Sequence, residues 1–473
     1  MLITVSGGQM AERKKTNAPS SIRAFLRNGY SSNRTVYFIG IGGSSMYTLA
    51  VLSMRMGFRV LGSDRSANYR TRSLMDMGIT VYIGHDPSHI DGADLVIYTG
   101  AISEKNPEYL KSLALGIPTL PRAEYLGLLM KDYKNRIGVS GTHGKSTTVA
   151  MLDMIFHEAS AEPTTLSGAE LSGGDLLRIG KGELLIYEAC EYKDSFLSFT
   201  PSIAIALNLE LDHTDYFPDI SALQSSFSSA MSNASSFSLI NYDDPNLRQI
   251  ISDIKSPVIT FGQSERSDYR YSINNFGDTF TEFTVFRHGV TAGVFKINVP
   301  GVHNVTNAAA AISVALEYGI DKDRIAAAMN DFRSIPRRME LVGSRRGREV
   351  YYDYAHHPTE IKATISALRL VTGTPITVVF KPHTYSRTAS LWDGFLSALS
   401  MADHVVMTDI FPAREEPIAQ ITSRRMSDNL GEKAMFSPDG EVSSYVDSFT
   451  CGAIVVMGAG DMEEIKNSLI SEP

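Results

Sequence analysis

The chain has 473 residues, of which 43% are hydrophobic and 20% are charged, with a formal net charge of -8. At about 150 residues per domain this length predicts roughly three domains, and the composition excludes disordered, collagen-like and disulfide-rich proteins. The acidic balance argues against a nucleic-acid partner, because phosphate-backbone binding requires a basic stripe. With only Cys190 and Cys451 present, a disulfide framework and a thiolate-rich zinc site are excluded as well.

Residues 1–31 lack sustained periodicity and are predicted to form a flexible leader. No apolar run reaches the roughly 20 residues that a bilayer-spanning helix needs. The start MLITVSGGQMAERKKTN also lacks the charged-then-apolar order of a signal peptide. The sequence therefore predicts a cytoplasmic protein with no membrane partner.

Residues 32–133 are predicted to form a first α/β domain. The run VYFIGIGG indicates a strand that enters a glycine turn, SSMYTLAVLSMRMG a helix, and RVLGSD, TVYIGH and DLVIYTG further strands of a parallel sheet. The loop GIGGSS, with Asp64 about 20 residues further on, also fits a dinucleotide-binding fingerprint, although Ser45 replaces its third glycine. NAD binding is therefore an open alternative for this domain.

Residues 134–334 are predicted to form a second α/β domain, and its start RIGVSGTHGKS carries the most specific signal in the chain. A strand runs into a glycine turn and then a helix, so backbone N–H groups face a phosphate. Lys145 would add a cation for the β- and γ-phosphates, and Ser146 a hydroxyl for magnesium. The strict pattern G-x-x-x-x-G-K-[ST] is not met, because Val139 stands at its first glycine.

Two further strands of this domain, ELLIYEAC and SIAIALNLELDH, are predicted to end in metal-binding side chains. Glu188 and Glu191 lie just past the run LLIY, and Asp212 and His213 follow the apolar part of the second segment. Carboxyl ends of parallel strands meet at one edge of a sheet, so a glutamate and His213 could complete a magnesium site begun by Ser146. Magnesium prefers oxygen, which leaves open whether His213 binds weakly, through water or to a second ion.

The rest of the chain predicts antiparallel strands and a third domain. Residues 269–299 alternate in short segments, YRYSINNF, TEFTVFRHG and GVFKINV, that are typical of antiparallel strands, and the helix NVTNAAAAISVALEYG follows. Residues 335–473 return to the α/β pattern with EVYYDYAHHP, PTEIKATISALRL, ITVVFKPHT, ADHVVMTDIFP and AIVVMGAGD. The sequence thus predicts three α/β domains in series.

Taken together, these segments resemble the Mur ligase family over nearly the whole chain after residue 31. The resemblance implies an N-terminal Rossmann-like domain for a UDP-sugar, a central P-loop ATPase-like domain and a C-terminal Rossmann-like domain. It is carried by GIGGSSM at 40–46, GTHGKST at 141–147, EACEYKDSF at 188–196, NLELDH at 208–213, GVHNVTNAAAA at 301–311, PRRME at 336–340, DYAHHPTE at 353–360 and KPHTYSRT at 381–388.

The resemblance also implies roles for individual residues. The ATP site is expected at Gly141, Thr142, His143, Gly144, Lys145, Ser146, Thr147, Asn304, Asn307, Arg338 and Asp353, and Mg²⁺ at Ser146, Glu188 and His213. The UDP-sugar is expected at Gly40, Gly42, Gly43 and Ser45, with Asp64 and His85 near the uridine. Catalytic roles are implied for Lys145, Glu188, His213, His357 and Arg387.

The segments DYAHHP and PHTYSRT resemble the branch of the family that joins L-alanine to UDP-N-acetylmuramate. The chain is then expected to be a monomer or a homodimer. His356, His357, His383 and Arg387 would then face the acyl phosphate and the incoming amino acid. The histidine pair could instead cap a helix. The sequence departs from many relatives at four positions: Ser146 replaces threonine, Tyr352 an acidic residue, Lys381 glutamine and Cys190 aspartate.

The implied activity is ATP-dependent amide ligation in peptidoglycan precursor synthesis through an acyl phosphate, with His357 or a metal-linked carboxylate as the base. Three alternatives stay open. A sister ligase that adds a preformed peptide to the same UDP-sugar would share almost every motif. A dinucleotide-dependent oxidoreductase would explain GIGGSS but not GTHGKS, and a non-catalytic nucleotide-binding regulator would not need Lys145, Glu188 and His213.

Overall fold

The computed structural model describes residues 34–171, 174–277, 280–413, 415–449 and 452–470. The leader predicted for residues 1–31 lies outside the described residues. The chain divides into two compact units, Met1–Leu129 and Met130–Pro473. Within the described ranges, no helix is both long enough and apolar enough to span a bilayer.

The first unit contains one five-stranded parallel sheet of order β3-β2-β1-β4-β5. The fully buried strand β1 (Thr35–Ile39) lies in the middle, with β2 on one side and β4 on the other. The winding direction reverses there, and ligands of such sheets bind outside the carboxyl ends of the strands at this reversal. The predicted Rossmann-like sheet is confirmed. Its other elements are α2 (Ser44–Arg55), β2 (Arg59–Asp64), α3 (Tyr69–Asp76), β3 (Thr80–Ile83), η2 (Pro87–Ile90), β4 (Leu95–Tyr98), α4 (Pro107–Ala114), β5 (Thr119–Pro121) and α5 (Arg122–Leu129).

The second unit begins with a ten-stranded sheet of order β15-β14-β13-β12-β11-β10-β6-β9-β7-β8. Strand β6 (Asn135–Ser140) pairs in parallel with β9 and β10, so the glycine loop after it emerges at the edge where both neighbours end. The parallel part contains η3 (Met130–Asp132), α6 (Lys145–Glu158), β7 (Thr164–Leu166), β8 (Leu177–Arg178), β9 (Leu184–Glu188), η4 (Tyr192–Ser198), β10 (Ile203–Ala206), α7 (Ile220–Met231), β11 (Phe237–Asn241), α8 (Pro245–Ile250), η5 (Ile251–Asp253) and β12 (Val258–Gly262).

Strand β10 is shorter than the sequence predicted. The prediction extended it to His213, whereas pairing with β6 stops at Ala206 opposite Ser140. Beyond that point the backbone bonds to the glycine loop instead of a strand: the Asn208 carbonyl accepts the Thr142 N–H at 3.3 Å. The prediction was wrong because an apolar run does not reveal where a neighbouring strand turns away.

The three predicted antiparallel strands are present. They are β13 (Tyr269–Phe276), β14 (Thr281–Arg287) and β15 (Val290–Ile297), and they extend the same sheet. Helix α9 (Val302–Glu317) then packs against α6 through a run of buried alanines, whose small side chains allow a close approach. Helix α10 (Lys322–Asp331) follows.

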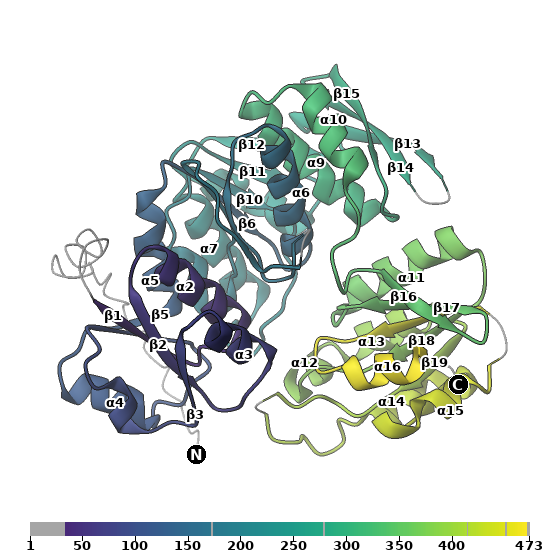
Figure 1. Ribbon diagram of the computed structural model, residues 1–473. Coiled ribbons are helices and arrows are strands. Elements are labelled where there is room, and N and C mark those ends of the chain that lie inside the picture. Colours follow the sequence, from purple (N-terminus) through teal and green to yellow (C-terminus); the bar gives the residue numbers. More distant parts are fainter. Residues whose placement is uncertain (1–33, 172–173, 278–279, 414, 450–451, 471–473) are drawn as a thin grey trace, which may run out of the picture. The chain divides into compact units, whose positions relative to one another are not determined.

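The third sheet has the order β16-β17-β21-β18-β19-β20, with β16 antiparallel and the others parallel. Alternate residues of β18 (Ile376–Phe380) enter two different cores: Val378 packs with helices α11 and α13, and Val379 with α15 and α16. Helices therefore cover both faces (Figure 1). The elements are β16 (Glu340–Arg345), β17 (Arg348–Asp353), α11 (Pro358–Thr372), α12 (Tyr385–Ser390), α13 (Trp392–Leu399), β19 (His404–Met407), α14 (Ser423–Leu430), η6 (Gly431–Lys433), β20 (Ala434–Phe436), η7 (Asp439–Glu441), α15 (Val442–Val446), β21 (Ala453–Met457) and α16 (Glu463–Ile470).

Candidate active site

The glycine loop between β6 and α6 has the backbone of a phosphate-binding loop. Gly144 is the N-cap of α6 at φ 83°, and no side chain caps the helix, so the N–H groups of its first turn are available to an anion. A Cβ at Gly144 would lie 2.4 Å from the Asn307 side-chain oxygen on α9. Glycine is therefore required here both for its conformation and for its lack of a side chain.

Lys145 is held against this loop. Its ammonium group donates to the carbonyls of Gly141 and Thr142 and to both oxygens of Glu191, at 3.3 and 3.2 Å. Burial alone would lower the pKa of Lys145, but the negative charge of the buried Glu191 outweighs it and raises that pKa. Lys145 is thus a cation held beside the glycine loop.

The predicted magnesium ligands lie around the same lysine. Ser146 is buried in the first turn of α6, and Glu188 ends β9, where the Gly168 N–H donates to its Oε1 at 2.6 Å. His213 approaches Glu191 rather than Glu188: its Nε2 lies 3.7 Å from Glu191 Oε1. A hydroxyl and two carboxylates suit a hard cation such as Mg²⁺, so the donor set fits, with Glu191 as an additional candidate ligand.

A cavity of about 240 Å³ next to the loop collects most of the expected ATP residues. It is lined from the loop, from α9 and from the segment around β17, which lie far apart in the sequence. Asn208, Asn241 and His303 add to its wall. The expected ATP residues in its lining are His143, Gly144, Thr147, Asn304, Asn307, Arg338 and Asp353, while Gly141, Thr142, Lys145 and Ser146 belong to the adjoining loop and first helical turn.

Asp353 organises the third-domain side of this cavity. Its carboxylate accepts the N–H groups of Met339 at 2.8 Å and Ala355 at 2.7 Å, which fixes the segment that carries Arg338. Burial raises the pKa of Asp353 to about 6, although Arg338 acts in the opposite direction. The Arg338 guanidinium itself lies 3.8 Å from Glu360 and over the Tyr354 ring.

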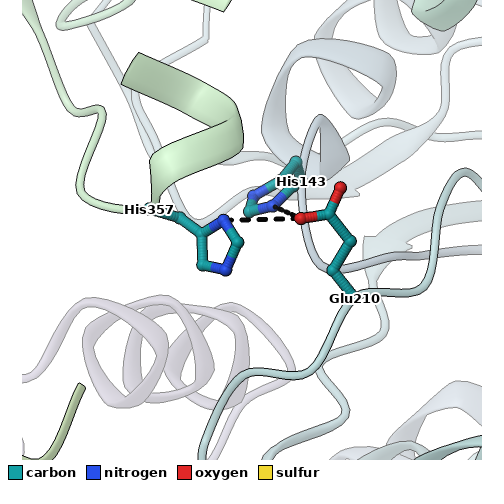
Figure 2. Close-up of side chains that lie close together, drawn as sticks. All are labelled: His143, Glu210 and His357. Carbon is teal, nitrogen blue, oxygen red and sulfur yellow. Dashed lines mark ion pairs between the residues drawn. The ribbon is translucent and has the colours of Figure 1, made fainter. Parts of the chain in front are cut away.

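A second polar cluster joins the phosphate loop to the start of α11. His143 Nδ1 lies 3.1 Å from Glu360 Oε1, and its Nε2 lies 3.6 Å from Glu210 Oε2 (Figure 2). Burial alone would lower the pKa of His143, but the two carboxylates outweigh it and raise the pKa to about 9. Burial would also raise the pKa of Glu360, yet His356, His143 and Arg338 hold it well below its usual range.

His357 is the N-cap of α11. Its Nδ1 accepts the Thr359 N–H at 3.3 Å, Pro358 occupies the first turn, and Glu360 bonds back to the His357 N–H, which completes a capping box. Burial, followed by the nearby His143, lowers the pKa of His357 to about 4. This geometry favours the capping alternative over a general base, because so weak a base takes up a proton poorly at neutral pH.

Arg387, another predicted residue of the third domain, forms a buried bidentate pair. Its Nε and Nη2 donate to Asp212 at 2.9 and 3.1 Å, and its Nη1 donates to His383 Nδ1 at 3.0 Å. Burial, with His356 and Arg387 close by, lowers the pKa of His383 to about 3. The His356 and His383 rings lie 6.0 Å apart, so Arg387, His383 and His356 lie together beside Asp212 and His213, whereas His357 lies closer to Glu210 and His143.

The first unit holds the other predicted site. Gly43 is the N-cap of α2, without a side-chain cap, Gly40 has φ 82°, and Ser45 lies in the first turn of the helix. The Gly42 N–H donates to Asp64 Oδ2 at 2.8 Å, so Asp64 supports the glycine loop directly. Within this unit the structure therefore presents an uncapped helix start at the carboxyl edge of the sheet, which suits a pyrophosphate.

His85 is held by a carboxylate that the sequence did not single out. Glu108 is fully buried, and its carboxylate accepts hydrogen bonds from the hydroxyls of Tyr37 at 3.0 Å and Ser63 at 2.5 Å. The Nδ1 atoms of His85 and His89 each lie 2.9 Å from the same carboxylate. Four partners satisfy this buried charge. The orientation of His85 is thus set by a group from another element, which no local pattern indicates.

The charged site residues missing from the prediction are glutamates. Glu191, Glu210 and Glu360 lie inside segments recognised as motifs, EACE, NLELDH and DYAHHPTE; Glu191 was considered beside Glu188 as a metal-capable carboxylate but was not chosen, and Glu210 and Glu360 were given no role. Their closeness in sequence to the assigned residues could have indicated them: Glu191, for example, lies three positions after Glu188. The choice between two nearby carboxylates depends on side-chain direction.

Comparison with known proteins identifies the class. Family models match in chain order: the Mur ligase family catalytic domain at residues 35–134, the Mur ligase middle domain at 139–315 and the Mur ligase glutamate ligase domain at 337–462. The chain belongs to the Mur ligase family, as its motifs predicted, and the expected three-domain architecture is confirmed.

Among its relatives are curated proteins named UDP-N-acetylmuramate--L-alanine ligase. The protein from Caldicellulosiruptor bescii is 41% identical, with 92% of this chain and 98% of the relative covered, and that from Caldicellulosiruptor saccharolyticus is 42% identical, with 91% and 94% covered. A solved structure of UDP-N-acetylmuramate-alanine ligase MurC from Thermotoga maritima is similar at 26% identity, covering 92% of this chain and 98% of that one, with a TM-score of 0.78.

A peptide-adding ligase is similar as well. The structure named UDP-N-acetylmuramate:L-alanyl-gamma-D-glutamyl-meso-diaminopimelate ligase from Neisseria meningitides is 28% identical, covers 65% of this chain and all of its own, and has a TM-score of 0.60. Both branches that the sequence left open thus have solved counterparts.

Proposed function

We propose that this chain is a ligase that uses ATP to form an amide bond between the lactyl carboxylate of UDP-N-acetylmuramate and L-alanine. The observation that carries the proposal is the cavity beside the phosphate loop, which joins Gly144 to Asn307, Arg338 and Asp353. The choice of L-alanine is supported by relatives of that activity that are 41 and 42% identical over nearly the whole chain.

The chemistry requires an activated carboxylate. The lactyl oxygen attacks the γ-phosphorus of ATP, the bond to the β-phosphate oxygen breaks, and ADP and an acyl phosphate form. The amine of L-alanine then attacks the acyl carbon, phosphate leaves, and the amine proton passes to a base. Since His357 Nδ1 is engaged by the Thr359 N–H as the cap of α11, we favour a carboxylate near His213 for this last step.

The residues of the loop supply positive charge and hydrogen bonds for the phosphates. Lys145 faces the phosphate position as a cation, and the free N–H groups of α6 add to it. Mg²⁺, held by Ser146, Glu188 and His213, would neutralise charge on the β- and γ-phosphates. Before a phosphate can bind, Lys145 must exchange its contacts with Glu191 and the loop carbonyls for the new ligand.

The third domain contributes to both substrates. Arg338 and Asp353 reach the nucleotide cavity, and Arg387 orients Asp212 beside His213. His356 and His383 would face the amino acid. In the first unit, the glycine loop with Ser45 would bind the UDP pyrophosphate, with Asp64 and His85 near the uridine. Domain bounds of 32–133, 134–334 and 335–473, a cytoplasmic location and a monomeric or homodimeric state complete the proposal.

The decisive experiment measures phosphate release with ATP and UDP-N-acetylmuramate across a panel of single amino acids and one tripeptide. We expect release to depend on L-alanine and to be lost in Lys145→Ala. Release driven by the tripeptide alone would establish the sister ligase instead. Release that is indifferent to any amine, or undiminished in Lys145→Ala, would refute the proposed reaction, and NAD(P)H binding would revive the oxidoreductase.

A further inference from the structure

Three side chains from separate segments converge on one point at the rim of the nucleotide cavity. His143 belongs to the phosphate loop, Glu210 to the segment after β10, and His357 to the start of α11. Glu210 Oε2 lies 3.6 Å from His143 Nε2 and 3.5 Å from His357 Nδ1, and the potential ligand atoms all lie within 4.8 Å of one another. Figure 2 shows both imidazoles turned toward the carboxylate.

These three atoms approach one another without forming hydrogen bonds. His143 Nε2 is buried and has no hydrogen-bond partner among the described residues. His357 Nδ1 accepts the Thr359 N–H at 3.3 Å, so it carries a lone pair rather than a proton, and it would exchange that contact for an ion bound beside Glu210.

The surroundings hold the cluster in place. His143 Nδ1 faces the Glu360 carboxylate at 3.1 Å, and a carboxylate on the far nitrogen is the usual support of a metal-binding histidine. The Thr359 hydroxyl donates to Glu210 Oε2 at 2.5 Å, and the Glu210 N–H donates to the Thr142 hydroxyl at 2.9 Å. Both protein ligands from the middle domain are therefore oriented before any ion arrives.

We propose that His143, Glu210 and His357 bind a transition-metal ion of the Zn²⁺ type, at a site distinct from that of Mg²⁺. A tetrahedral ion about 2.1 Å from each ligand places neighbouring ligand atoms roughly 3.4 Å apart. The two measured separations, 3.5 and 3.6 Å, are close to that edge length. Two imidazoles and one carboxylate favour Zn²⁺ over Mg²⁺, which prefers an all-oxygen shell.

The position of the site indicates what the ion would do. His143 and Glu210 line the nucleotide cavity, and His357 begins α11. A bound ion would therefore link the phosphate loop to the third domain, and its fourth coordination position would border the cavity. This inference is independent of the proposed reaction, because it concerns metal binding by the chain without nucleotide.

The test is metal binding by the full chain, prepared without a histidine tag and stripped with a chelator. We expect one equivalent of Zn²⁺ to compete with a chromophoric indicator, and Co²⁺ to give intense tetrahedral absorption bands without a sulfur charge-transfer band. Glu210→Gln and His357→Ala should each weaken Zn²⁺ binding by about 100-fold or more, and Glu360→Gln by about 10- to 100-fold. The exposed His288, replaced by alanine, is the matched control and should leave affinity unchanged.

Three results would overturn the site. They are the absence of Zn²⁺ binding at micromolar concentrations, equal binding by Glu210→Gln and wild type, and displacement of the ion by millimolar Mg²⁺. The first would mean that a protonated His143 alone joins the two carboxylates. Because His357→Ala also removes the cap of α11, its thermal unfolding is measured in parallel, and Glu210→Gln, which leaves the cap intact, is decisive.

Discussion

Replacing Gly144 by alanine should separate two costs that this glycine avoids. The first is conformational, because Gly144 has φ 83°, where a Cβ costs about 1–2 kcal/mol. The second is steric, because that Cβ would lie 2.4 Å from the side-chain oxygen of the buried Asn307. Overpacking of this kind costs roughly 1–3 kcal/mol, so Gly144→Ala should destabilise the chain by about 2–5 kcal/mol.

Gly319 provides the matched control. It has the same φ of 83°, but nothing lies within 4 Å of the position its Cβ would take. Gly319→Ala should therefore cost only the conformational part, about 1–2 kcal/mol. The difference between the two variants isolates the contact with Asn307.

The assay is kcat/KM for ATP, together with the free energy of unfolding of each variant. A shift of the loop against Asn307 by a few tenths of an ångström should lower kcat/KM for ATP about 10- to 100-fold in Gly144→Ala, since each tenfold loss corresponds to about 1.4 kcal/mol. Gly319→Ala should stay within about twofold of wild type. Equal effects of the two substitutions on kcat/KM would refute the reasoning, because they would leave no role for the loop-to-α9 contact.

Four further predictions follow from the same contacts. Lys145→Ala should abolish phosphate release and should also lower thermal stability, because the buried Glu191 carboxylate loses its cationic partner. Glu108→Ala should cost the first unit about 3–5 kcal/mol in chemical denaturation, because it leaves the buried hydroxyls of Tyr37 and Ser63 and two partly buried histidines without their partner. A double-mutant cycle on Arg387→Met and Asp212→Asn should give a coupling energy of about 1–3 kcal/mol, since both groups are buried in a bidentate pair. The last prediction concerns His143, whose pKa is raised to about 9, and is tested with a chelator present. Protonated His143 stabilises the fold fully below pH 6.5, and this stabilisation is lost as the pH rises through 9. The free energy of unfolding of the wild type should therefore fall by up to roughly 3 kcal/mol across that range, whereas that of His143→Asn should not.

Each of these outcomes has a clear opposite. Phosphate release that persists in Lys145→Ala would contradict the role of Lys145, and an unfolding midpoint of Glu108→Ala equal to that of wild type would contradict the role of Glu108. A coupling energy near zero would contradict the Arg387–Asp212 pair. Parallel pH curves for wild type and His143→Asn would contradict the stabilisation by protonated His143. Conservative variants serve as controls: Glu108→Gln retains an acceptor, and Arg387→Lys retains the charge but not the bidentate geometry.

The sequence by itself determined the family, the order of the elements and the place of the phosphate loop. These features depend on local patterns. At residues 136–158 an apolar run, a glycine-rich segment and a helix-length amphipathic segment follow one another, and this pattern predicts a strand, a loop and a helix. The alternation at 269–299 predicts antiparallel strands in the same way. The family motifs then indicated the candidate site residues, and the individual roles of these residues stay predictions.

Only the tertiary structure decided which of these residues meet. Asp212 and Arg387 are 175 positions apart and form one buried pair, Glu191 rather than Glu188 contacts Lys145 and His213, and His357 caps a helix while its Nδ1 faces Glu210. The physical reason is that such contacts depend on strand order, on register and on where a strand ends, as at Ala206. A pattern along the chain specifies the period of an element, whereas the direction of a carboxylate is set by neighbours from other elements.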